Sequence, residues 1–243
     1  SPISTLTYYS HWLLLNKIKQ KGFKVTLSGV GSDELFSGYY VHHNLFLADL
    51  FNQNKKLFKR TLLNWKKYQS KIVTNKYLKD PKLFIKNPNF RSNVYQYREE
   101  LKKFFKNPLK EKFQEKKFNN GILRNRMFNE LFYEHVPVVL HEEDHNNMFL
   151  SMENRAPFLD KALFEYSLSI PFDFLIGDGF AKNILRKSMI GLVPNIILNQ
   201  RRDAYTLISD LCSVMRAEAF YTNGSLSIVQ DRPTNIATNT SDP

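Results

Sequence analysis

The chain has 243 residues, of which 42% are hydrophobic and 14% aromatic, enough to bury a core in one large domain or two small ones. It contains no run of about eighteen apolar residues, which argues against a membrane-spanning helix. Its first twenty residues lack the basic region of a secretory signal. Cys212 is the only cysteine, so no internal disulfide forms, which agrees with the cytoplasmic location that we expect.

The formal net charge of +12 raises nucleic acid as a partner class. However, the lysines of residues 54–117 occur singly or in pairs at helical spacing. That pattern is typical of the solvent-facing side of amphipathic helices. We therefore expect no nucleic-acid partner. A basic nucleic-acid-binding module is the non-enzymatic alternative, which the salt dependence of binding would distinguish.

The charge changes sign near the end of the chain. Lys187 is the last lysine, and residues 203–243 carry five acids against two arginines, a net charge of −3, so the first 202 residues carry +15. The composition also turns to Thr, Ser, Asn and Pro. We interpret residues 203–243 as an unrelated or divergent tail on a domain that spans residues 1–202.

In chain order, apolar spacing first predicts a helix over residues 5–21, closed by Gly22. A short β-rich run over 23–27 follows and ends in Ser28-Gly29. The order helix, loop, strand indicates half of a βαβ unit, and such units form parallel sheets.

The next long segment, residues 39–118, has a helical pattern with turns at 80–81 and 87–88. Another amphipathic helix is predicted over 122–135, closed by Pro137.

Residues 153–160 are predicted to be irregular, and two further helices are predicted over 161–168 and 179–189. Residues 224–229 near the end indicate a strand. The expected fold class is therefore α/β, with a parallel sheet early and a mainly helical part after it.

The segment with the most chemical information is VTLSGVGSDELFSGYY, residues 25–40. Glycines at the carboxyl end of a strand let a ligand approach the backbone, and an acid at the following helix start can hold a divalent metal. Ligands bind at that edge of open α/β sheets. The alternative is a tight turn followed by a helix that Ser32 caps, with the acids serving the helix dipole. Neither the dinucleotide nor the Walker spacing is present.

Three segments resemble the synthetase domain of glutamine-hydrolysing asparagine synthetases. LSGVGSDELFSGYY resembles the family signature LSGxGxDELFGGY, and the stretch 123–160 ends in SMENRAPFLD, similar to S-x-E-x-R-x-PFLD. The third, DGFAKNILR at 178–186, is similar to DGxxKxxLR. The matches occur in the family's order over roughly residues 1–202. The resemblance implies a parallel-sheet nucleotide-binding domain of the adenine nucleotide alpha hydrolase type.

By this resemblance, the enzyme activates the side-chain carboxylate of aspartate with Mg-ATP as an aspartyl-adenylate, and ammonia from glutamine displaces AMP. Such chemistry needs positive charge around the leaving pyrophosphate. Asp33 matches the Mg²⁺ ligand, and Lys182 matches the lysine that neutralises the phosphates. Arg155 matches an arginine near the reacting groups; its alternative is an ion pair that shapes the loop, with Glu153 or Asp160.

The resemblance places four residues on the nucleotide side: Ser28, Gly29, Gly31 and Ser32. Lys182 and Arg186 lie four residues apart, so on a helix they would share a face, where a bound polyanion offsets their repulsion. Asp144 and Glu153 are candidate substrate contacts, and the alternative for Asp144 is a solvated acidic turn formed with Glu142 and Glu143.

The chain also departs from the family. Val30 occupies the position of a glutamate thought to transfer protons, which leaves open a related amidotransferase or a macrolactam-forming ligase with another acid substrate. Ser37 replaces the first glycine of GGY. The SGGxDS phosphate loop and the glutaminase domain are not found in the 243 residues. We therefore expect the chain alone to be inactive, and its strand at 25–27 to promote self-association.

Two other patterns compete with this interpretation. HEEDH at 141–145 matches H-E-x-x-H, in which two histidines one helical turn apart bind zinc in metalloproteases. The family match explains the same residues, so we predict no zinc there. Residues 209–233 resemble part of a bacteriophage tail-tip protein, which indicates a join near 202–204, with a divergent C-terminus as the alternative.

Overall fold

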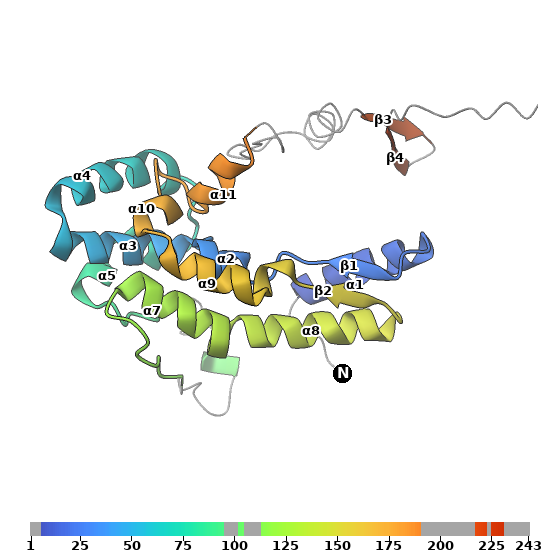
Figure 1. Cartoon of the computed structure of the whole chain (residues 1–243), viewed down its shortest axis with the longest axis horizontal. Coiled ribbons are helices and arrows are strands. Elements are labelled where there is room, and N and C mark those ends of the chain that lie inside the picture. The colour runs from blue at the N-terminus through green and yellow to red at the C-terminus, as the bar shows by residue number, and fades with distance from the viewer. Residues whose placement is uncertain (1–5, 95–101, 105–112, 191–216, 223–224, 231–243) are drawn as a thin grey trace, which may run out of the picture. The chain divides into compact units, whose positions relative to one another are not determined.

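The computed structural model describes residues 6–94, 102–104, 113–190, 217–222 and 225–230. The chain divides into two compact units, Ser1–Leu185 and Arg186–Pro243 (Figure 1). The tail boundary expected at residue 202 lies outside the described residues. Within those residues, no helix is long and apolar enough to cross a membrane.

The first unit begins with a small parallel sheet flanked by two helices. Helix α1 (Leu6–Gln20) precedes strand β1 (Val25–Leu27), which pairs in parallel with β2 (Glu153–Arg155) in the register Val25↔Glu153 to Leu27↔Arg155. Helix α8 (Val136–Phe149) contacts both α1 and β2 (Figure 1). The predicted helix, strand and parallel pairing are thus confirmed, and Leu27 is 73% exposed.

The remainder of the first unit is helical and surrounds α3 (Tyr40–Gln53), whose residues 41–50 are all buried. A helix buried on every side belongs in the centre of a core. Its neighbours include α4, α5 and α7. The elements of this part are α2 (Ser32–Phe36), α4 (Lys55–Asn64), the π-helical turn η1 (Trp65–Gln69), the 3₁₀ turns η2 (Lys76–Lys79) and η3 (Lys102–Phe104), and α5 (Lys82–Lys86).

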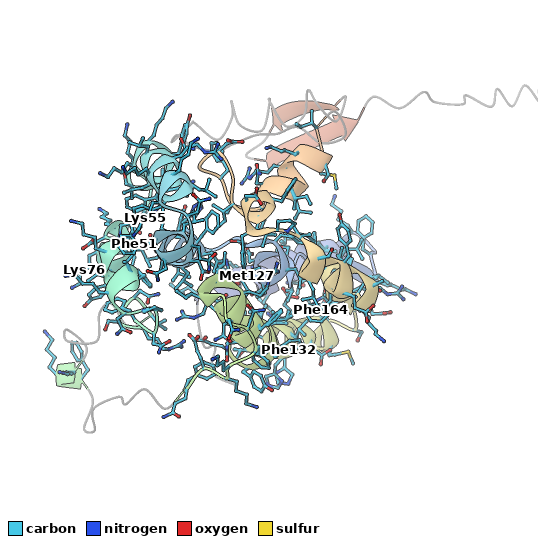
Figure 2. The ribbon with its side chains drawn as sticks, turned by 60° about the vertical axis from the view of Figure 1, so that its left-hand side comes forward. Phe51, Lys55, Lys76, Met127, Phe132 and Phe164 are labelled. Carbon is cyan, nitrogen blue, oxygen red and sulfur yellow. The ribbon has the colours of Figure 1, made fainter. Side chains whose placement is uncertain are left out.

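Later elements also pack against this core. They are α7 (Ile122–Asn129), the π-helical turn η4 (Glu130–Glu134), the 3₁₀ turn η5 (Pro157–Leu159), α9 (Lys161–Ser169) and α10 (Phe172–Leu175). The short helix α11 (Asn183–Ser188) spans the boundary between the two units. Met127 is fully buried, and the rings of Phe132 and Phe164 meet edge to face, 5.7 Å apart (Figure 2). Lys55 is the first residue of α4, and its ammonium lies 3.5 Å from the ring centre of Phe51, near the end of α3 (Figure 2).

Asp49 joins α3 to the start of α7. Its two carboxylate oxygens accept the backbone N–H groups of Ile122 and Leu123 at 2.8 and 2.9 Å. The first N–H groups of a helix have no intrahelical acceptor, and here a buried side chain from another helix supplies it. Burial raises the pKa of Asp49, and the two backbone hydrogen bonds oppose that shift.

We expect Asp49→Ala to lower the free energy of unfolding by about 2–3 kcal/mol, because it leaves two N–H groups without their charged acceptor. Asp80→Ala is the matched control, since Asp80 accepts a single exposed N–H, from Lys82 at 3.0 Å, and should cost about 1 kcal/mol or less. Urea unfolding of the three proteins measures the difference. Equal small losses would contradict this assignment.

Three predictions of secondary structure and one alternative are wrong, each for a local reason. Residues 113–118 are not helical, because side chains of α7 bind their backbone: Asn129 accepts from the N–H of Lys116 at 2.8 Å. The segment 142–144 is not an acidic turn but lies inside α8. Residues 153–155, predicted to be irregular, form β2. The helix expected from 179 begins at Asn183, because Gly179 and Lys182 have positive φ angles of 89° and 53°.

In the second unit, β3 (Ala217–Thr222) and β4 (Ser225–Gln230) form an antiparallel hairpin with the register Ala217↔Gln230 to Thr222↔Ser225. The predicted strand near the end is confirmed as β4. The prediction missed β3, although Asn223-Gly224 between the strands is the strongest short hairpin signal in a sequence.

Candidate active site

The signature segment forms the turn between β1 and α2. Gly31, not Ser32, is the residue that precedes the helix, with φ 92° and no side-chain cap. A cap by Ser32 is therefore wrong. The backbone N–H of Ser28 donates to the carbonyl of Arg155 at 2.8 Å and so extends the pairing of β1 with β2. The turn consequently begins at the carboxyl edge of the small sheet.

Asp33 and Lys182, 149 positions apart in the sequence, meet at this edge. The ammonium Nζ of Lys182 lies 2.9 Å from Oδ1 of Asp33 and donates to Oγ of Ser32 at 2.9 Å. Their side chains are 28% exposed for Lys182 and 33% for Asp33. The pair is thus accessible to a ligand from solvent and also packed against the protein.

Two glycines leave the space that the contact between Asp33 and Lys182 requires. A Cβ on Gly38 would lie 1.4 Å from Oδ1 of Asp33 and 2.6 Å from Cε of Lys182. Gly179, in the turn before Lys182, accepts a hydrogen bond from Gln69 at 2.5 Å, and a Cβ there would lie 2.5 Å from the ring of Tyr68. Both positions therefore need a residue without a side chain.

The helical argument for Lys182 and Arg186 is wrong. Lys182 precedes α11 in a left-handed conformation, so the two cations do not share a helix face. Arg186 belongs to the second unit, and its role toward phosphates stays a prediction. The evidence for Lys182 is its contact with Asp33 and Ser32, not its helical spacing.

Arg155 forms an ion pair with Glu153, with Nε 2.8 Å from Oε1. The side chains are 64% and 57% exposed. The hydrogen bond that Arg155 donates to Glu153 and the negative charge of Glu153 raise the pKa of Arg155. This contact matches the ion-pair alternative for Arg155, and contact of either residue with substrate stays a prediction.

Among the acids of α8, Glu143 is held at the sheet edge. Its carboxylate accepts from Nδ2 of Asn154, on β2, at 2.7 Å, and the same amide lies 3.5 Å from Oγ of Ser28. Asp144, the preferred sequence candidate, is exposed. Helical spacing could have identified Glu143. It lies four residues before Asn147 and so shares a helix face with it, and Asn147 accepts a hydrogen bond from Thr26 of β1 at 3.1 Å.

A buried polar cluster behind α2 also escaped sequence analysis. The hydroxyl of Tyr39 donates to Glu34 at 2.6 Å, and burial and this hydrogen bond raise the pKa of Tyr39. The backbone N–H of Tyr39 donates to Nδ1 of His42 at 3.4 Å. Nε2 of His42 therefore carries the proton and donates to Glu130 at 2.6 Å. The cluster fixes α2, and with it Asp33, against α3 and η4.

The HEEDH segment lies within α8. His141 and His145 are exposed, with ring centroids 4.2 Å apart. In the parts of the chain that the structure describes, no group of three or more His, Cys, Asp or Glu side chains is arranged to hold a metal ion.

We expect purified protein to contain no stoichiometric zinc, because two exposed histidines alone leave half of a tetrahedral site to water. Metal analysis after dialysis measures this. Zinc at one ion per chain that disappears in His141→Ala or His145→Ala would overturn the prediction.

Comparisons with known proteins show the family to which the chain belongs. The Asparagine synthase family model matches residues 2–219. The chain belongs to this family. The match continues past residue 203, into the segment that sequence analysis assigned to an unrelated or divergent tail.

Two relatives come from Bacillus subtilis (strain 168). Asparagine synthetase [glutamine-hydrolyzing] 1 is 26% identical over 196 residues, which cover 76% of this chain and 31% of the relative. Asparagine synthetase [glutamine-hydrolyzing] 3 is 28% identical over 190 residues, covering 76% of this chain and 27% of the relative. The chain therefore spans less than a third of the length of these relatives. No solved structure matches it.

The residues at the sheet edge fit a magnesium nucleotide. Asp33 supplies one partly exposed carboxylate, and Lys182 supplies a cation within reach of the same space. Glu34, the residue after Asp33, is buried and accepts a hydrogen bond from the hydroxyl of Tyr39. It is therefore not available as a second metal ligand. Mg²⁺ bound with ATP uses one or two carboxylates together with the phosphates, which agrees with this set.

Proposed function

We propose that this chain forms the phosphate side of the Mg-ATP site in an asparagine synthetase. The family is one of ATP-dependent, amide-forming ligases. The observation that supports the proposal is the contact of Lys182 with Asp33 and Ser32 at the carboxyl edge of the β1–β2 sheet. Magnesium ATP would supply the adenylyl group that activates an acid for attack by ammonia.

The charges of Asp33 and Lys182 suit this chemistry. The Asp33 carboxylate would hold the metal, and the Lys182 ammonium would turn from Asp33 to the phosphate oxygens, where negative charge builds up as pyrophosphate leaves. Ser28, Gly29, Gly31 and Ser32 would line the nucleotide. The exposed Arg155 is proposed near the reacting groups, and Arg186 near the phosphates.

The proposed substrates and their contacts are inferred from the family resemblance. Aspartate is the proposed acid, with Glu153 and Asp144 as candidate contacts, and ammonia released from glutamine by a glutaminase is the proposed nitrogen source. We place the reaction in the cytoplasm, where ATP is available. For the 243 residues alone we propose no turnover, because Asp33 would be a single carboxylate facing a strongly hydrated ion.

One observation favours an alternative substrate. Val30 packs against the apolar core, in the position where the family resemblance expects a proton-transferring glutamate. A valine neither accepts a proton nor binds ammonium. This residue favours an amidotransferase or macrolactam-forming ligase that acts on another acid.

Pyrophosphate exchange distinguishes these functions. We would test a chimaera in which this chain replaces the matching segment of a Bacillus subtilis relative, with that relative as the positive control. Exchange into ATP that depends on aspartate, with asparagine identified by mass spectrometry when ammonia is added, supports asparagine synthesis. Exchange that depends on a different carboxylic acid supports the alternative, and no exchange with any acid in a folded chimaera contradicts both.

A further inference from the structure

The turn that precedes Lys182 has the hydrogen bonds and φ angles of a type I′ hairpin turn. The backbone N–H of Phe180 donates to the carbonyl of Gly177 at 2.9 Å, and the N–H of Gly177 donates to the carbonyl of Phe180 at 3.1 Å. Asp178 and Gly179, between them, have φ angles of 55° and 89°. A type I′ turn requires positive φ at both central residues, and Asp-Gly is a preferred pair there. The turn is thus a compact unit that ends just before Lys182.

Lys182 is itself held in an unfavourable backbone conformation. Its φ angle is 53°, in the left-handed region that strains any residue with a Cβ. Such a residue persists only where the surrounding structure holds it. From this conformation its ammonium reaches Asp33 and Ser32, at 2.9 Å from each. The contacts that hold the turn therefore decide whether the ammonium lies beside Asp33.

The π-helical turn η1 contacts this turn through two consecutive residues. Gln69 is 6% exposed, and its Nε2 donates to the carbonyl of Gly179 at 2.5 Å, across 110 positions of the sequence. The ring of Tyr68 lies so close to Gly179 that an added Cβ would come within 2.5 Å of it. The same ring packs on that of Phe180, with 5.1 Å between centroids. Single π-helical turns are rare and frequently lie at functional sites.

We propose that Gln69 and Tyr68 are positioning residues that hold the ammonium of Lys182 beside Asp33. They act through the backbone and ring of the preceding turn. Without the donor from Gln69, the carbonyl of Gly179 loses its hydrogen bond, the turn relaxes, and Lys182 leaves its left-handed conformation. The consequence for catalysis rests on the proposed function, because the ammonium serves the phosphates only if ATP binds at this sheet edge.

Trace acetylation of the 243-residue chain, measured for each lysine by mass spectrometry, tests the positioning without ATP. The side chain of Lys182 is 28% exposed and that of Lys161 is 87% exposed, so Lys182 should react about threefold more slowly, in the ratio 87/28. Gln69→Leu keeps the side-chain size but removes the donor, and it should bring the two rates together. Lys19, partly buried on α1, should keep its rate. Retained protection of Lys182 in Gln69→Leu would overturn the proposal, and so would a parallel rise at Lys19, which would show a general structural role.

Tyr68 offers a matched pair of variants if Gln69→Leu does not fold, because Tyr68 is only partly buried. Tyr68→Ala removes the ring from the turn and should deprotect Lys182, whereas Tyr68→Phe keeps the ring and should keep the protection. Ser70→Ala is the control on the same segment, since it removes a hydrogen bond to the carbonyl of Lys66, at 2.7 Å. Protection that survives Tyr68→Ala, or that is lost in Ser70→Ala, would overturn the proposal.

Pyrophosphate exchange by the chimaera tests the consequence for catalysis. Gln69→Leu should slow exchange about tenfold or more, because a misplacement of about 1 Å can cost about a hundredfold. In a Lys182→Ala background it should slow exchange no further, since residues that act as a unit give non-additive losses. Losses that multiply would overturn the proposal. Exchange absent from the parent chimaera would contradict the proposed function, and the acetylation rates would still decide the positioning.

Discussion

Lys182→Ala is expected to slow ATP–pyrophosphate exchange by the chimaera about a hundredfold or more, judging from the loss of single charge-stabilising groups in other enzymes. Asp33→Asn should have a similar effect, because the amide removes the charge that would hold the metal. Lys161→Ala is the matched control, because Lys161 is exposed and pairs with Glu165 on the surface of α9, at 3.8 Å. Exchange at the normal rate in either site variant would remove that residue from the site.

The same variants should leave thermal stability nearly unchanged. The Asp33–Lys182 pair is about one-third exposed, and ion pairs near the surface contribute about 0–1 kcal/mol. Differential scanning calorimetry therefore separates a loss of chemistry from a loss of fold. A large fall in melting temperature would assign the pair a structural role instead.

Gly38→Ala is expected to reduce exchange as strongly as Asp33→Asn. The added Cβ would lie 1.4 Å from Oδ1 of Asp33, so the carboxylate has to leave its position beside Lys182. Ser37→Gly is the matched control on the preceding residue. Ser37 already has a left-handed φ of 66°, which glycine adopts without strain, so exchange should persist. Normal exchange in Gly38→Ala would show that Asp33 acts from another position.

Local sequence pattern predicted the elements that carry their own signals. α1 has apolar spacing and a terminal glycine, β1 is β-rich, and α9 follows Asp160, whose side chain accepts from the N–H of Leu163 at 3.0 Å. β2 lacks such a signal. Its residues Glu153, Asn154 and Arg155 are polar, and they form a strand because β1 pairs with them across more than 120 positions.

The candidate site was likewise predictable only in part. The signature motif and the family resemblance named Asp33 and Lys182, and the structure brings them together. Their meeting depends on the turn at 178–182, which helical periodicity misread. His42 and Glu130, 88 positions apart, carry no local sign of their pairing. Such contacts arise from the packing of α3 on α7, whose C-cap residue is Glu130, and a single sequence carries no local pattern that predicts this packing.

Titration calorimetry of ATP binding to the chimaera, with and without Mg²⁺, tests the central claim most directly. If Asp33 holds the metal and Lys182 the phosphates, Asp33→Asn should abolish the gain in affinity that Mg²⁺ gives. Lys182→Ala should weaken binding under both conditions. An undiminished magnesium effect in Asp33→Asn, together with normal ATP affinity in Lys182→Ala, would contradict the placement of the nucleotide at the edge of the β1–β2 sheet.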